Sequence, residues 1–188
     1  MIMRIVACVA LALLGCKGDA KSSSDNHAAD FDHPKVDWSH DAVSTVQDEV
    51  DGHHFAVDLP SGLKREAKKS DGTYPGYVTW TSPNPFEGPS FTVRPIEAAM
   101  LPSDWETVPM NDTALAPTQV VTEKALLAGG SYFVIEEPDK KFLEVSIYKK
   151  APGGALLFEI MQRTSAPMAA FDAERAWFLK IGRTLVVK

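Results

Sequence analysis

Cysteine is scarce in this chain of 188 residues. The only two cysteines are Cys8 and Cys16, so residues 17–188 hold no thiol that could form a disulfide or ligate a metal ion. A domain built from those residues must be held together by its hydrophobic core.

Histidine is absent after His54. A Ser–His–Asp hydrolase needs a nucleophile, a base and an orienting acid, and the Gly-x-Ser-x-Gly turn that carries such a nucleophile is also missing. Gly129-Gly130 and Gly153-Gly154 fall between predicted strands, where glycine serves turn geometry rather than phosphate binding. We therefore expect no enzyme. The alternative is an envelope hydrolase that uses loop carboxylates, namely Glu136, Glu137 and Asp139.

Long hydrophobic runs are missing too. Arg4 is followed by an apolar run from Ile5 to Leu14, which is too short to span a bilayer, since a spanning helix takes about 20 residues. A short positive region followed by such a run is typical of a signal peptide.

The run ends in Leu13-Leu14-Gly15-Cys16, which resembles the lipobox of bacterial lipoproteins. The resemblance implies cleavage before Cys16 and attachment of lipid to its thiol. Leu14 departs from the commonest pattern, which has Ala or Ser there, and an ordinary secretory peptide is the alternative. The implied location is the cell envelope, and Lys17 after the cysteine favours the outer membrane, facing the periplasm or the cell surface.

Clusters of basic residues are missing as well. Residues 17–51 hold three lysines against nine acidic residues, whereas residues 52–188 hold fifteen basic against sixteen acidic residues. The net charge of −6 therefore arises in the first segment. A nearly neutral domain lacks the basic face that nucleic-acid binding needs, so we expect no nucleic-acid partner.

These features divide the chain into three parts. Residues 1–15 are expected to be a signal peptide, residues 16–51 a lipidated, acidic and flexible tether, and residues 52–188 a single globular domain. A short amphipathic helix from Asp37 to Val50 is an alternative for the end of the tether.

All five histidines lie in or beside the tether, interleaved with aspartates. Imidazole and carboxylate suit divalent first-row metals, which raises the hypothesis of a metal-scavenging tether. The irregular spacing favours a solvated linker instead, and we expect no cofactor. The weak candidates for metal ligands are His27, His33 and His40.

From His53 onward, short alternating stretches separated by Gly and Pro predict strands. Apolar residues at helical spacing predict one helix over residues 167–181. The strands are predicted at 55–59, 77–81, 91–95, 120–127, 131–136, 141–149, 155–163 and 184–187, and the Pro152-Gly153-Gly154 link makes two of them an antiparallel hairpin.

Three stretches of this pattern resemble the PsbP-like superfamily: residues 55–62, the hairpin around 152–154, and residues 178–185. The resemblance implies an α+β fold in which a central antiparallel sheet carries helices packed on its faces, an α/β/α sandwich. It also implies a small non-enzymatic module that binds partners, although a fold alone does not select the partner.

Several aromatic residues fall in proline-rich connections, where exposed rings commonly anchor partners. The predicted binding residues are Tyr74, Tyr77, Phe86 and Trp105. The expected partners are a membrane, through lipid on Cys16, and an envelope protein or small ligand of unknown identity.

Overall fold

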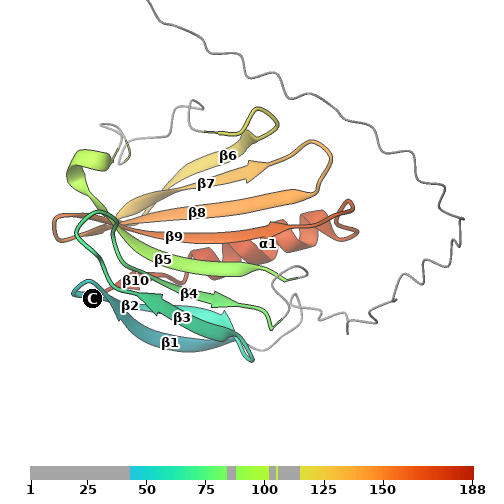
Figure 1. The fold of residues 1–188 in the computed structure, drawn as a ribbon. Helices are drawn as coiled ribbons and strands as arrows, with labels where there is room; N and C mark the ends of the chain where they lie inside the picture. The colour runs from blue at the N-terminus through green and yellow to red at the C-terminus, as the bar shows by residue number, and fades with distance from the viewer. Residues whose placement is uncertain (1–42, 84–87, 102–104, 106–114) are drawn as a thin grey trace, which may run out of the picture. The chain divides into compact units, whose positions relative to one another are not determined.

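The computed structural model describes residues 43–83, 88–101, 105 and 115–188, drawn as the coloured ribbon of Figure 1. Their backbone forms two antiparallel sheets, one α-helix and a short 3-10 helix. The elements in chain order are β1 (Val43–Val50), β2 (His53–Pro60), β3 (Lys64–Lys68), β4 (Tyr77–Thr81), β5 (Ser90–Glu97), η2 (Ala98–Met100), β6 (Val120–Leu127), β7 (Gly130–Glu136), β8 (Phe142–Ala151), β9 (Gly154–Arg163), α1 (Phe171–Gly182) and β10 (Val186–Val187).

The larger sheet has seven strands in the order β3-β4-β5-β9-β8-β7-β6. It joins two runs of consecutive strands, and Figure 1 shows them side by side where β5 meets β9. Phe91 lies opposite Ile160 at this junction, and Val93 lies opposite Phe158. All four side chains are buried, so the junction belongs to the core.

The turn between β8 and β9 follows directly from its sequence. Pro152 and Gly153 are the two residues between the paired ends Ala151 and Gly154, and Gly153 has a φ of 78°. Proline followed by a glycine at positive φ is the pattern of a type II turn. Gly154 must itself be glycine, because a Cβ there would lie 2.0 Å from the carbonyl oxygen of Ile96.

The smaller sheet has three strands in the order β1-β2-β10. Phe55, Val57 and Leu59 of the central strand alternate with partly or fully exposed neighbours, as expected of a strand with one buried face. The smaller sheet therefore contributes one apolar face to the core.

The core lies between the larger sheet on one side and the smaller sheet with α1 on the other, and these elements contact one another. Burial of the apolar side chains in this core is the main stabilising contribution, because no disulfide is present in the described residues. The largest fully buried side chains of this core are Phe55, Phe91, Phe158, Phe178, Leu59, Leu143, Ile147, Leu156, Ile160 and Ile181.

Helix α1 packs on the core through one face and is also bound by charge. Arg175 donates from Nε to Glu136 Oε1 at 2.7 Å and from a terminal nitrogen to Glu123 Oε2 at 2.6 Å. Tyr132 donates its hydroxyl proton to Glu123, and the Arg183 guanidinium lies 5.3 Å from the centre of the Tyr132 ring. This network, which we call the α1 clamp, fixes the helix against β6 and β7.

The predicted fold class is wrong. The described chain is mostly β, and its single α-helix shares one side of the larger sheet with a second sheet, whereas an α+β sandwich would carry helices on the sheet faces. The physical reason is that β1, β2 and β10 pair with one another and present Phe55, Val57 and Leu59 to the core. A sheet thus occupies much of the position that the resemblance assigned to helices.

The first described residues also differ from expectation. Residues 43–50, which the sequence places in the tether, form β1, and Val46 pairs with Val57 of β2. The amphipathic helix proposed to end at Val50 is therefore wrong over these residues. Val46 and Val50 share a face at strand spacing as well as at helical spacing, so periodicity did not separate the two structures.

The remaining predicted strands are confirmed, with bounds shifted by a few residues, and so are the hairpin and the helix. The strand β3 was missed. All five of its residues are exposed, so Lys64–Lys68 has no buried face and no alternation of apolar and polar residues.

Candidate functional site

The larger sheet has a second face that turns away from the core, and we call it the outer face. Side chains directly opposite one another in antiparallel strands lie on the same face. The register therefore aligns a polar row across five strands: Glu66, Thr79, Thr92, Glu159 and Ser146. The adjacent row contains Lys68, Tyr77, Arg94, Leu157 and Tyr148.

Arg94 and Glu159 form a two-bonded ion pair on the outer face. Arg94 donates from Nε to Glu159 Oε2 at 3.0 Å and from a terminal nitrogen to Oε1 at 3.1 Å. Burial lowers the pKa of Arg94, but the hydrogen bonds and charge of Glu159 outweigh it and raise that pKa overall. The guanidinium is therefore a permanent charge committed to Glu159.

Glu144 lies on the neighbouring strand and differs from Glu159. Its Oε1 accepts a hydrogen bond of 2.6 Å from the Ser146 hydroxyl. Burial raises the pKa of Glu144 above its usual value, and repulsion from Glu159 adds to this, against the opposing effects of the Ser146 hydrogen bond and the Arg94 charge. The two carboxyl groups are thus in unlike environments, one held by a guanidinium and one by a neutral hydroxyl.

Aromatic rings lie next to these polar residues of the outer face, around Tyr148. The Tyr148 ring is 6.4 Å from the Trp105 ring and 5.7 Å from the Phe133 ring, measured between centroids. Burial, followed by the charge of Glu159, raises the pKa of Tyr148 to about 12, so its phenol stays protonated. Ser131, opposite Tyr148 in the register, is 1% exposed and its hydroxyl has no hydrogen-bond partner.

This arrangement offers a hydrogen-bond acceptor on Glu144, a donor on Tyr148 and an aromatic surface, beside the Arg94–Glu159 pair. A small number of placed polar groups beside aromatic side chains is typical of small-ligand sites. Residues with perturbed pKa values also gather at functional sites. The outer face is therefore one candidate site of the described chain, for a small ligand.

The predicted binding residue Tyr74 lies elsewhere, on the loop between β3 and β4. Its side chain is 66% exposed. Asp71 Oδ1 accepts hydrogen bonds of 2.9 Å from the backbone N–H groups of both Thr73 and Tyr74, and the Ser70 hydroxyl donates to the Tyr74 carbonyl at 3.1 Å. The exposed ring is thus carried by a fixed backbone.

Asp51, in the turn between β1 and β2, anchors both ends of the same loop. It accepts hydrogen bonds from the backbone N–H groups of Ser70 at 3.2 Å and Gly76 at 2.7 Å. A Cβ on Gly76 would lie 2.6 Å from the Asp51 carboxylate and 2.7 Å from the Lys68 carbonyl oxygen. The close approach of these segments therefore requires glycine at position 76.

The other predicted binding residues are divided. Tyr77 is 37% exposed at the start of β4, on the outer face opposite Lys68 of β3. Trp105 is partly buried against Tyr148. Phe86, the lipidation residue Cys16 and the histidines His27, His33 and His40 lie outside the described residues.

The loop carboxylates considered for hydrolysis are each engaged. Glu136 belongs to the α1 clamp, Glu137 pairs with Arg163 at 3.0 Å, and Asp139 lies 3.4 Å from Lys141. The structure does not bring them together around a common open site.

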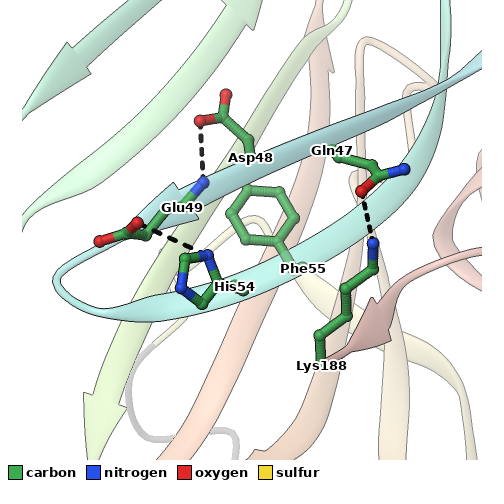
Figure 2. A pocket seen from close by; sticks show the side chains of 6 residues that line it. All are labelled: Gln47, Asp48, Glu49, His54, Phe55 and Lys188. Atoms are coloured by element: carbon green, nitrogen blue, oxygen red, sulfur yellow. Dashed lines mark hydrogen bonds and ion pairs between the residues drawn. The ribbon is translucent and has the colours of Figure 1, made fainter.

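A surface depression of about 350 Å³ lies at the smaller sheet, and Figure 2 shows its lining side chains. The His54 ring lies 3.5 Å from Glu49, and Lys188 donates to Gln47 at 2.6 Å. Burial raises the pKa of Asp48, but hydrogen bonds from Arg65 and from the Glu49 backbone outweigh it and lower that pKa. Because these groups already bond to one another or to neighbouring residues, the depression is a weaker candidate than the outer face.

The described part of the chain contains neither a metal-ligand cluster nor a membrane-spanning helix. No group of three or more His, Cys, Asp or Glu side chains there is placed to hold a metal ion. No helix among these residues is both long enough and apolar enough to cross a membrane.

Comparison of the chain with protein-family models and with curated proteins gives no match.

Sequence reasoning predicted Tyr77 and Trp105 but missed the charged and hydroxyl-bearing residues of the outer face. Glu144, Ser146 and Tyr148 alternate with buried Leu143, Val145 and Ile147, so the strand pattern already assigned them to the opposite face. Glu159 could also have been placed, because the β8–β9 turn sets it opposite Ser146. Nothing local indicates that Arg94, 65 positions away, would reach Glu159.

Proposed function

We propose that this chain is a lipid-anchored envelope protein whose domain binds a partner without catalysing a reaction. The anchor is supported by the sequence alone, through the apolar run and Leu13-Leu14-Gly15-Cys16. The binding role is supported by one structural observation, the exposed Tyr74 ring on a hydrogen-bonded loop.

A tyrosine in this setting suits recognition for two reasons. Its ring is 66% exposed, so it gains from burial against a partner. The loop beneath it is already fixed by Asp71, Ser70 and Asp51, so little backbone freedom is lost when a partner binds. The contact area of the tyrosine ring then contributes favourable binding free energy that exceeds this small loss of freedom.

The three loop carboxylates considered for hydrolysis give the catalytic alternative no support. Glu136, Glu137 and Asp139 each have a basic partner, so no unpaired base or acid is presented among them. Their ion pairs have structural roles, and the hydrolase alternative has no geometry that favours it.

The proposal can be tested by photocrosslinking in intact cells. A photoreactive phenylalanine analogue at position 74 should give one discrete covalent adduct. The matched control places the same analogue at Val186, which is 56% exposed on the smaller sheet, and should give none.

The fixed loop supplies a second variant. Asp71→Ala removes the acceptor for two backbone N–H groups, so the yield of the position-74 adduct should fall several-fold while the melting temperature changes little. Absence of any adduct at position 74, or the same adducts at positions 74 and 186, would contradict a partner surface at this loop.

A further inference from the structure

Glu144 is a partly buried carboxyl group that forms no ion pair with any described residue, although the charge of Arg94, which is bonded to Glu159, acts on it. The one bond that the structure gives it comes from the neutral Ser146 hydroxyl. A desolvated carboxylate is costly unless it is paired, and the raised pKa of Glu144, caused first by burial, reflects that cost.

The nearby basic side chains are committed to other acids. On β9, the register places Met161 opposite Glu144, with Glu159 and Arg163 as its diagonal neighbours. Arg163 bonds to Glu137 at 3.0 Å, and Arg94 of β5 bonds to Glu159 through both oxygens.

On the other side of Glu144, the facing residue of β7 is the apolar Ile135. The charges that face Glu144 are therefore balanced among themselves, and Glu144 is the carboxylate left over.

A second observation on the same face points to a missing ligand group. The Ser131 hydroxyl is buried and unpartnered beside Tyr148, although buried polar groups in folded proteins nearly always have a hydrogen-bond partner. The rings of Trp105 and Phe133 lie against the same tyrosine. The strip from Glu144 to Tyr148 thus combines an unmatched negative charge, an unmatched hydroxyl and aromatic walls.

We propose that this strip of the outer face binds a small organic cation, with an ammonium group at Glu144 and an apolar part toward the Tyr148 and Trp105 rings. The ammonium group supplies the counter-charge that the protein lacks, and aromatic faces attract cations and apolar groups alike. The site is separate from the Tyr74 loop and does not depend on the proposed partner binding.

A metal ion suits the strip less well. Calcium takes about 6–8 oxygen ligands and magnesium about six, whereas Glu144 is a single uncommitted carboxylate. No metal-ligand cluster occurs in the described ranges. An ammonium group needs only one carboxylate and a few hydrogen-bond acceptors.

Isothermal titration calorimetry of the full chain in detergent tests the proposal with phenylethylammonium as the probe. Uncharged 2-phenylethanol is the matched ligand. We expect the cation to bind, and the alcohol to bind at least tenfold more weakly or not at all. Equal binding of both probes, or no binding of the cation, overturns the proposal.

Glu144→Gln keeps the size of the side chain and an acceptor for Ser146 but removes the charge, so it should weaken cation binding at least tenfold. The control is Glu66→Gln, a fully exposed carboxylate on the same face that pairs with Lys64, and it should bind as the wild type does. Wild-type affinity in Glu144→Gln, with a cooperative thermal transition retained, would overturn the assignment.

The pH dependence gives an independent readout. Because the cation selects ionised Glu144, affinity should rise with pH through the raised pKa of that group and then level off, with proton release on binding in the acidic range. Glu144→Gln should abolish this rise. Tyr74→Ala should leave the titration unchanged, which separates this site from the proposed partner surface.

Discussion

Arg175 of α1 donates a 2.7 Å hydrogen bond to Glu136 of β7, 39 positions earlier in the chain. The same guanidinium reaches Glu123 of β6, so one side chain connects the helix to the two strands at that edge of the larger sheet. The helix position thus depends on charge as well as on its apolar face.

Arg175→Ala should lower the free energy of unfolding by about 1–3 kcal/mol, because it leaves two partly buried carboxylates without their partner. Urea denaturation measures this effect. Lys180→Ala, an exposed change on the same helix, should alter stability by less than about 0.5 kcal/mol. If the two variants were equally stable, the α1 clamp would have no energetic role.

Phe158→Ala should cost about 3–5 kcal/mol of stability, because it empties a position at the junction of β5 and β9 that is fully buried. Tyr74→Ala should cost less than about 0.5 kcal/mol, since that ring is exposed. The measurement is chemical denaturation of both variants. A loss at Tyr74 comparable with that at Phe158 would show that the loop ring is part of the packing.

Glu144→Gln should raise the melting temperature at neutral pH. A carboxyl group whose folded pKa is raised binds protons more readily in the folded state, so its favourable contribution is present at low pH and is lost as pH rises through the folded pKa. The variant removes this loss. Melting curves from pH 3 to 8 should therefore diverge as pH increases, and parallel curves for the two proteins would refute the buried position of Glu144.

Cys16→Ser should abolish palmitate labelling and release the protein from membranes. The reason is that stable anchoring takes two acyl chains or a second signal, which lipidation of the cysteine would supply. The measurement is metabolic labelling followed by membrane fractionation. Labelling that persists in the variant would rule out the lipobox.

Local patterns in the sequence predicted much of the larger sheet. Leu143, Val145 and Ile147 alternate with polar residues, and a Pro-Gly turn follows, so the β8–β9 hairpin could be foreseen. The smaller sheet could not, because it depends on pairing that no local signal reports: Val186 lies opposite Ala56. That pairing, with β1, is the reason the fold class was wrong.

The candidate site was predicted poorly for a related reason. Aromatic residues in proline-rich connections predicted binding residues on the loops, and one of them, Tyr74, is exposed. The polar strip of the outer face is assembled in two steps. Pairing of β8 with β9 brings Glu144 close to Glu159, and pairing of β5 with β9 then adds Arg94. Only the first of these steps follows from neighbouring sequence.

The pairing of β10 with β2 has a consequence for the order of folding. The backbone N–H of Asp58 in β2 donates a hydrogen bond of 2.9 Å to the hydroxyl of Thr184, 126 positions later, and the next residue, Leu185, is buried in the core. Contacts of such long range form slowly, because loop closure must precede them. A chain that emerges from a ribosome or a translocation pore can form the β8–β9 hairpin early. It cannot close its core until residues 184–187 have also emerged.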